Sequence, residues 1–319
     1  MPDNLRLNLS NCMGFTNHRS GWNYAIKSLS AYHSKSGIYV DDFIERSFSW
    51  DIEEYEFLKN KHKLPYNFKW VGFLHNPPNM PYWFDTCHSP QAILNRPVFQ
   101  KSLKNCVCIF TLSNYLRDWL KTQIDVPVFS VMHPTEHCLI KWSPFKFIKK
   151  EKTLVQLGYW LRNIGAICDI KNTIYSKKWL PSDVTYARVM LDVEERINSI
   201  HWTTSKYRWE GTEILGHLKN EDYDELLSYC VVFLNLYDSS ANNAIIECIA
   251  RNTPVLVNKI PAVVEYLGED YPLYIDQNKN MLTTQNVLRA HHYLKNMNKD
   301  WLNGTYFCSK VVESIKEVL

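Results

Sequence analysis

One segment in the last third of the chain constrains the fold more than any other. An apolar run at 231–236 ends in a small polar loop at 238–243, and residues 244–249 then place apolar side chains at helical spacing. The sequence Asn-Thr-Pro at 252–254 interrupts that helix before a second apolar run at 255–257. The order strand, polar loop, helix, strand predicts a βαβ unit, whose first loop lies at the ligand-binding edge of a parallel sheet.

The start of this predicted helix has the features of an anion site. The backbone N–H groups of Asn242, Asn243 and Ala244 lie where a helix leaves its donors unpaired and able to bind a phosphate. Glu247 follows about one turn later, where its carboxylate can accept hydrogen bonds from a ribose diol. Together these residues indicate a site for a nucleoside diphosphate.

The same residues resemble the C-terminal donor-binding motif of the GT-B glycosyltransferases, in particular the retaining enzymes called family 4. Glu247 matches the second glutamate of that motif, and residues 254–255 match its Pro-Val end. Asn252 replaces the usual glycine, and Ser239 stands where the first glutamate falls, with Asp238 one residue earlier. The resemblance implies that Asp238 or Ser239 contacts the sugar hydroxyls in place of that glutamate.

The resemblance also implies an α/β fold with two Rossmann-like domains facing a cleft, the GT-B architecture. A chain of 319 residues suits two domains of roughly 150 residues each. We expect an N-terminal acceptor-side domain at 1–138, a linker at 139–152 and a nucleotide-sugar-binding domain at 153–300. A C-terminal helix at 301–319 is expected to pack back on the first domain.

The first domain is expected to open with a strand at 4–13, a loop containing Gly14 and Gly21, and a helix. The loop lacks the G-x-G-x-x-G pattern of dinucleotide-binding proteins. In GT-B enzymes the corresponding loop carries glycines that approach the donor phosphate or the acceptor, so Gly14 and Gly21 are candidates for that role. A structural turn is the alternative. A strand at 37–43 and a charged helix at 51–62 are predicted next.

Residues 68–75 predict a strand that runs directly into a proline-rich loop at 76–81. The prolines favour an extended loop, which places His75 at the carboxyl end of the strand. Family 4 members often carry a histidine near the transferred sugar at a comparable place. The resemblance therefore implies that His75 binds that sugar or lies near the acceptor hydroxyl, and a histidine that caps the loop is the alternative.

A strand at 107–113 and a helix at 114–121 are predicted next, with Ser113 as a favourable N-cap residue. In the family the start of this helix faces the cleft, which makes Ser113 a candidate ligand contact. A strand at 126–132 completes the domain. The following residues, 139–152, mix aromatic side chains with lysines. Such a stretch can contact an anionic membrane weakly, although a solvated linker is the commoner interpretation.

The second domain is expected to begin with a strand at 153–158 that ends in Gly158, followed by Arg162. The family carries an arginine or lysine in this loop that grips the donor diphosphate. The guanidinium suits that task because its fork of N–H donors matches phosphate oxygens. Lys171 and Lys206 are candidates for a companion lysine. Further strands are predicted at 184–191, 213–218 and 271–275, and further helices at 282–297 and 306–318.

Asp222 and Asp224 form a D-x-D sequence, which is the metal signature of the other major glycosyltransferase fold. Because both residues lie at the start of a predicted helix, we interpret them as first-turn acids that interact favourably with the helix N-terminus. We therefore expect no metal and no cofactor beyond the nucleotide-diphosphate sugar, which is a co-substrate.

Composition excludes several classes of protein. The net charge of +3 does not indicate a nucleic-acid partner, and no signal peptide or membrane-spanning run is visible. Nine cysteines without a C-x-x-C pair fit a reducing compartment, so a cytoplasmic location is expected.

These features predict a metal-independent glycosyltransferase, a hexosyl- or pentosyltransferase of the retaining type. The donor would be a UDP- or GDP-sugar, and the acceptor a hydroxyl of a glycan or glycoconjugate. His75, Arg162, Asp238 and Ser239 are assigned to catalysis, and Gly14, Gly158, Arg162, Asn242, Asn243, Ala244 and Glu247 to donor binding. Two alternatives remain: a nucleotide-sugar epimerase of similar architecture, and a non-catalytic protein that binds a nucleotide sugar or a glycan.

Overall fold

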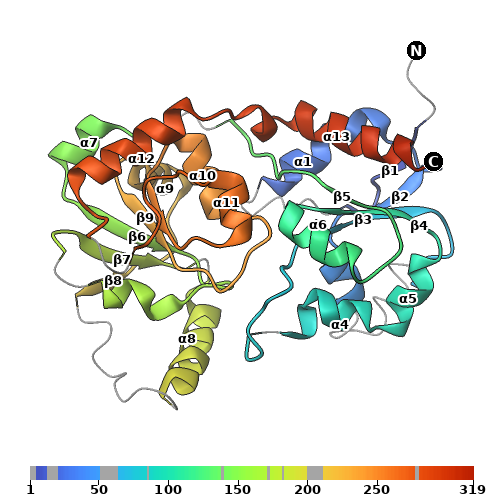
Figure 1. Ribbon diagram of the computed structural model, residues 1–319, viewed down its shortest axis with the longest axis horizontal. Coiled ribbons are helices and arrows are strands. Elements are labelled where there is room, and N and C mark those ends of the chain that lie inside the picture. Colours follow the sequence, from blue (N-terminus) through green and yellow to red (C-terminus); the bar gives the residue numbers. More distant parts are fainter. Residues whose placement is uncertain are drawn as a thin grey trace. The chain divides into compact units, whose positions relative to one another are not determined.

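The computed structural model describes residues 5–12, 21–50, 64–84, 86–137, 140–170, 173–181, 183–199, 211–276 and 280–319. The chain divides into two compact units. The first unit comprises Met1–Glu136, Ser239–Asn243 and Asn298–Leu319, and the second comprises His137–Asp238 and Ala244–Met297. Each unit is built on a parallel sheet of five strands with helices packed against it (Figure 1).

The first sheet has its strands in the order in which they follow one another along the chain. They are β1 (Leu7–Asn8), β2 (Ile38–Asp41), β3 (Trp70–Leu74), β4 (Cys106–Thr111) and β5 (Val128–Ser130). The helices that the structure describes in this unit are α1 (Trp22–Ser28), α4 (Pro90–Leu94), α5 (Pro97–Leu103), α6 (Asn114–Lys121) and α13 (Gly304–Glu317).

Strand β3 separates two hydrophobic clusters because its side chains alternate between the faces of the sheet. Val71 and Phe73 join a cluster with Trp22 of α1 and Phe307 of α13. Trp70 and Leu74 join the cluster on the other face, which includes residues of α5 and α6. Figure 1 shows α1 and α13 side by side over the first sheet, so residues near both ends of the chain share one core.

The second sheet has the order β10-β9-β6-β7-β8. Its strands are β6 (Thr153–Leu157), β7 (Ser176–Leu180), β8 (Thr212–Ile214), β9 (Val231–Leu234) and β10 (Val255–Val257). Its helices are α7 (Pro144–Lys149), α8 (Val184–Ser199), α9 (Asn220–Leu227), α10 (Asn243–Arg251), α11 (Pro261–Leu267) and α12 (Thr284–Asn296). Short 3-10 helices occur at Ser30–Tyr32, Thr86–His88, Ile164–Asp169 and Asp300–Leu302, and a π-helix at Arg46–Trp50.

The strand predicted at 184–191 is wrong, because these residues form the first half of α8. Ala187, Met190, Leu191 and Glu194 are buried at positions i, i+3, i+4 and i+7, which is the spacing of one helix face. The β-branched residues at the start of the segment favoured a strand, but the buried helix face continues beyond the segment to Glu194. The strand next to β6 is instead β7, whose sequence SKKWL carries too little apolar alternation to predict it.

Two other predicted elements differ from the structure. Residues 139–152 include a helix, α7, where a linker was expected, because Ser143 accepts a hydrogen bond from Lys146 N at 3.3 Å and Pro144 occupies the first turn. Residues 271–275 form no strand and contribute only an isolated bridge between Val257 and Tyr274. The helix predicted at 51–62 lies outside the described residues.

Candidate functional site

The second sheet contains a topological switch point between β6 and β9. From β6 the chain adds β7 and β8 on one side, then returns to place β9 and β10 on the other. The connections that leave the carboxyl ends of β6 and β9 therefore depart in opposite directions. Ligands of open α/β sheets bind in the crevice that this divergence creates.

Backbone hydrogen bonds tie together the two loops at this switch point. Arg162 and Leu236 form an antiparallel bridge, and Asn163 N donates to Asn235 O at 2.8 Å. Tyr237 N donates to Leu161 O at 2.9 Å. The loop after β6 and the loop after β9 thus behave as one structural element.

Asn258, which follows β10 at the same edge, fixes this element further. Its Oδ1 accepts from Leu236 N at 2.8 Å, and its Nδ2 donates to Leu236 O at 2.9 Å. Sequence reasoning missed Asn258, although its place directly after a predicted strand was a usable signal. The amide side chain is suited to this role because it can donate and accept at once.

Glu194 of α8 stabilises the loop after β6 through hydrogen bonds to its backbone. Its side chain is fully buried, and it accepts from Ile164 N at 2.8 Å and from Gly165 N at 3.4 Å. Sequence reasoning missed this residue as well, because its segment was expected to begin as a strand. A buried carboxylate that binds two backbone donors holds the loop in one conformation.

Arg162 is the cation of this site. Its Nη1 donates to Trp160 O at 2.8 Å, and it forms no ion pair with a carboxylate among the described residues. Its Nε is buried and has no hydrogen-bond partner in the described part of the chain. Burial lowers the pKa of Arg162 to about 10, so the guanidinium is positively charged at neutral pH. The site therefore presents a charge that an anion can neutralise.

Gly158 makes room for this guanidinium. Its φ of 69° lies in the left-handed region, and a Cβ at this position would lie 3.2 Å from Arg162 Cζ. Leu161, in the same loop, also has a positive φ, of 50°. Non-glycine residues adopt this conformation only where the surrounding structure imposes it. The structure therefore brings Gly158 and Arg162 together, at the edge of the sheet.

Glu247 lies on α10, the helix that follows β9. It is buried, and its Oε2 accepts a hydrogen bond from Tyr223 Oη of α9 at 2.6 Å. Tyr223 is a neighbour that sequence reasoning did not identify. Asp238 is also buried and groups with the same unit as Arg162 and Glu247.

The polar loop before α10 is divided between the two units. Ser239–Asn243 groups with the first unit, whereas Ala244 groups with the second. Ser239 and Ser240 are buried, and Ser240 Oγ lies 3.1 Å from Ser113 Oγ at the N-cap of α6. Asn242 and Asn243 are half-buried. Of the expected phosphate-binding N–H groups, those of Asn242 and Asn243 thus belong to the first unit and that of Ala244 to the second.

His75 lies at the carboxyl end of β3 in the first unit. Its ring stacks on Phe43 at a centroid distance of 4.0 Å and meets Trp22 edge-on at 4.5 Å. Its Nε2 lies 3.1 Å from the carbonyl oxygen of Asp42, so Nε2 carries the proton and donates. Burial lowers the pKa of His75 to about 3, which keeps the ring neutral with Nδ1 as an acceptor.

An ionisable cluster that sequence reasoning missed holds His75 in place. Glu45 is fully buried, and its Oε1 accepts from His75 N at 2.7 Å and from Asn76 N at 2.6 Å. Burial raises the pKa of Glu45 to about 7. Arg46 is buried, and it donates to Asp42 Oδ1 at 3.2 Å. The residues fall in a segment that gave no motif, so only the fold brings them together.

The remaining candidates separate into two groups. Gly14, Lys171 and Lys206 lie outside the described residues. Gly21 has a φ of 73°, and a Cβ there would lie 2.8 Å from the carbonyl oxygen of Pro134. The left-handed backbone and the close approach of Pro134 therefore account for a glycine at this position.

The D-x-D residues belong to α9, where Asp222 lies in the first turn and Asp224 pairs with Arg251 at 2.7 Å. In the described residues, no group of three or more His, Cys, Asp and Glu side chains is arranged to hold a metal ion. No helix within the same residues has both the length and the apolar character that crossing a bilayer requires.

No family model matches this chain, and no curated protein matches it in sequence. Several solved structures match its fold. Sucrose-phosphate synthase from Thermosynechococcus elongatus is 12% identical, with 88% of this chain and 69% of that chain covered and a TM-score of 0.51. Trehalose-6-phosphate synthase OtsA is 10% identical over 93% and 76% of the two chains, with a TM-score of 0.53. The chain has the GT-B glycosyltransferase fold.

The predicted GT-B fold class is thus confirmed. A third GT-B match is a trehalose-6-phosphate structure from E. coli that is bound with UDP-2-fluoro glucose. It is 11% identical, covers 93% of this chain and 77% of its own, and has a TM-score of 0.52. At these identities the likeness establishes the GT-B fold alone.

Proposed function

We propose that this protein transfers a sugar from a nucleotide-diphosphate sugar to a hydroxyl group of a glycan or glycoconjugate, without a metal ion. The observation that carries the proposal is Arg162, a half-buried cation at the switch point of the second sheet with no carboxylate partner among the described residues. A UDP- or GDP-sugar supplies the diphosphate that would neutralise it. The UDP-sugar in a structure of the same fold supports this choice of donor.

Glycosyl transfer passes through an oxocarbenium-like state while negative charge accumulates on the departing diphosphate. A fixed positive group beside the leaving group lowers the energy of that state more than that of the bound donor. We assign this task to Arg162, with the backbone N–H groups of Asn242, Asn243 and Ala244. Because the guanidinium is already held by Gly158 and Trp160, little reorganisation is needed during the reaction.

The other assignments follow the chemistry of each side chain. Glu247 is assigned to the ribose, because a carboxylate can accept from both hydroxyls of a diol. Asp238 or Ser239 is assigned to the sugar hydroxyls. His75, neutral and with Nδ1 as an acceptor, is assigned to a hydroxyl of the reacting sugar or of the acceptor. By resemblance to the family, we expect a hexosyl- or pentosyltransferase that retains the anomeric configuration.

The first test replaces Arg162 with alanine and measures both UDP binding by calorimetry and release of UDP during turnover. We expect weaker UDP binding and a loss in rate of about 10²–10³-fold, as for removal of one oxyanion donor. Arg289→Ala, an exposed arginine of α12, is the matched control and should behave as the wild type. Turnover of the wild type should be the same with and without EDTA.

Unchanged UDP and GDP affinity in Arg162→Ala would show that the diphosphate binds elsewhere. Conversion of the nucleotide sugar without any acceptor would favour an epimerase. Nucleotide binding with no release of nucleoside diphosphate under any condition would favour a non-catalytic binding protein.

A further inference from the structure

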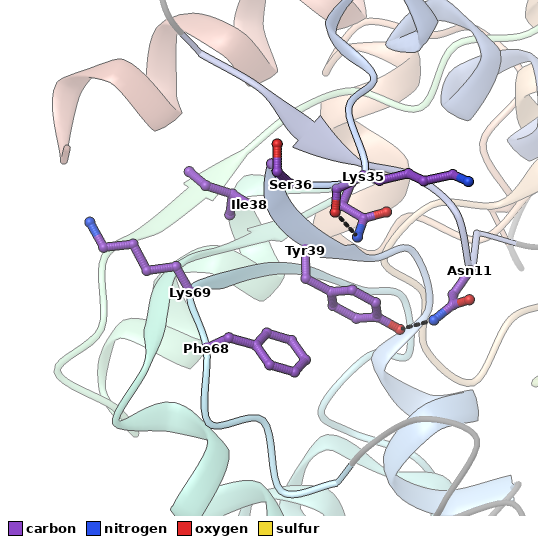
Figure 2. A pocket seen from close by; sticks show the side chains of 9 residues that line it. Asn11, Lys35, Ser36, Ile38, Tyr39, Phe68 and Lys69 are labelled. Atoms are coloured by element: carbon purple, nitrogen blue, oxygen red, sulfur yellow. Dashed lines mark hydrogen bonds between the residues drawn. The ribbon is translucent and has the colours of Figure 1, made fainter.

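The first unit contains a cavity of about 440 Å³ that none of the assignments above uses. It is bounded by residues at the end of β1, by residues before and within β2, and by the segment that enters β3. Figure 2 shows it from close by, with side chains from β2 and from the segments next to β1, β2 and β3 around one space. A concave site with aromatic and polar groups is the common form of a small-molecule or sugar site.

Two aromatic rings form the apolar part of this cavity. Tyr39 and Phe68 lie with their centroids 5.5 Å apart at an angle of 65°. Tyr39 is 7% exposed, and its Oη accepts from Asn11 Nδ2 at 3.3 Å (Figure 2). Phe68 is only half-buried. Aromatic faces beside amide and hydroxyl groups suit a sugar ring, which has apolar C–H faces and polar edges.

The charge of the cavity is entirely positive. Its nine lining residues include two lysines, Lys35 and Lys69, and no carboxylate. Both lysines are exposed, and neither forms an ion pair with a carboxylate in the described part of the chain. In Figure 2 their ammonium groups point outward on different sides of Tyr39. Asn8 Nδ2 donates to Lys35 O at 3.0 Å and holds that segment in place.

A series of contacts connects the cavity with His75. The backbone oxygen of Asn11 accepts from Arg46 Nη2 at 3.4 Å, and Arg46 pairs with Asp42 at 3.2 Å. The carbonyl oxygen of Asp42 in turn accepts from His75 Nε2 at 3.1 Å. A ligand that contacts Asn11 is therefore linked to the candidate catalytic histidine only through Arg46 and Asp42.

We propose that this cavity binds an anionic glycan, with a sugar ring against Phe68 and Tyr39 and with acidic groups paired to Lys35 and Lys69. The acidic groups are carboxylates or phosphates. This inference deepens the proposed function by naming the class of acceptor, and it rests on that function only for the acceptor role. Binding of the glycan itself needs no donor and no turnover.

The experiment measures binding of three oligosaccharides of equal length by calorimetry at low and high salt. They are tetragalacturonate, which carries carboxylates, phosphorylated maltotetraose, and neutral maltotetraose. We expect one or both charged glycans to bind more tightly than the neutral one, with an affinity that falls as salt screens the lysines. A preference between the two charged glycans distinguishes a carboxylated from a phosphorylated ligand.

The double variant Lys35→Gln/Lys69→Gln should weaken binding of the charged glycan by about tenfold, as expected for two exposed ion pairs. Lys101→Gln/Lys104→Gln, a pair of exposed lysines on and beside α5, is the matched control and should bind as the wild type. Phe68→Ala should weaken binding of the same glycan several-fold. It should leave binding of inorganic polyphosphate unchanged, because polyphosphate has no sugar ring to stack.

Two results would overturn the proposal. One is equal affinity for charged and neutral glycans. The other is a loss of affinity in the control pair as large as in the Lys35/Lys69 pair, which would indicate attraction by general positive charge. Neither result concerns the donor site, because UDP binding is measured separately and should be unchanged in all of these variants. Conversely, loss of the proposed function through Arg162 would leave glycan binding intact.

Discussion

The ionisable residues around β3 acquire their properties from burial rather than from their type. Glu45 and His75 are joined through a backbone N–H, yet burial moves their pKa values in opposite directions, to about 7 and to about 3. In both cases the neutral form is favoured, because a charge loses its hydration when it is buried. Burial thus keeps the His75 ring neutral, as its proposed role as a hydrogen-bond partner of a sugar hydroxyl requires.

Glu45 is expected to make the stability of the protein depend on pH. Between the usual value of 4.5 and its raised pKa of about 7, the folded state binds more protons than the unfolded state. The contribution of this residue to the free energy of unfolding therefore falls as pH rises through that window, by about 3 kcal/mol in total. Glu45→Gln cannot ionise, so its stability relative to the wild type should increase from pH 4.5 to pH 8.

Urea unfolding of Glu45→Gln and the wild type across this pH range measures the difference directly. Glu317→Gln, an exposed carboxylate at the end of α13, is the control and should follow the wild type at every pH. His75 and His133 act in the opposite sense. Burial lowers the pKa of each, so the stability that each contributes is lost as pH falls below the ordinary pKa of histidine. Both histidines are present in the wild type and in Glu45→Gln, so their contribution cancels in the difference between the two proteins. A stability difference that does not change with pH would contradict the raised pKa of Glu45.

At the scale of elements, helix α6 shows where local sequence is sufficient. Its bounds are those predicted, because Ser113 caps the first turn by accepting from Leu116 N at 3.2 Å. Buried Leu116 and Leu120 then repeat at a spacing of four residues on the inner face. Helix α8 shows the converse. Its first residues favour a strand locally, and burial of one helix face decides the outcome.

Ser113 does more than cap α6. Its Oγ also lies 3.1 Å from Ser240 Oγ. Ser113→Ala should lower the free energy of unfolding by about 2 kcal/mol, one part for the cap and one for the second hydrogen bond. Ser89→Ala, which removes the N-cap of α4 alone, should cost only about 1 kcal/mol.

A double-mutant cycle with Ser240→Ala isolates the second hydrogen bond. We expect a coupling of about 0.5–1.5 kcal/mol between the two serines, measured by urea unfolding. Additive effects of the two substitutions would show that Ser240 contributes nothing through Ser113, and that the loop Ser239–Asn243 is held by other contacts.

At the scale of the whole molecule, the two sheets differ in the feature that makes a ligand site. Among the described strands, those of the first sheet follow chain order without a switch point, whereas the second sheet reverses direction at β6. The nucleotide is therefore expected to bind the second unit at the ends of β6 and β9. The first unit presents His75 and the lysine-lined cavity instead.

Hydrogen exchange in the presence of UDP tests this division of roles. Saturating UDP, at about 100 times its Kd, should stabilise the bound state by about 2.7 kcal/mol and slow exchange in residues 158–165 and 235–247 accordingly. Residues of β4 in the first unit serve as the internal control and should exchange at their unliganded rates. Protection confined to residues of the first unit outside Ser239–Asn243 would place the nucleotide there and contradict the assignment of Arg162.

The sequence by itself determined the fold class, most strands and the candidate residues at their ends. These features depend on neighbouring residues, through the alternation of apolar side chains, the N-cap at Ser113 and the polar loop after β9. Only the tertiary structure decided which strand ends meet. It joined Arg162 to Leu236, placed Glu194 beneath their loop and gathered Glu45 with His75. Those contacts link residues far apart in the chain, and their energy comes from burial and pairing that no local pattern records.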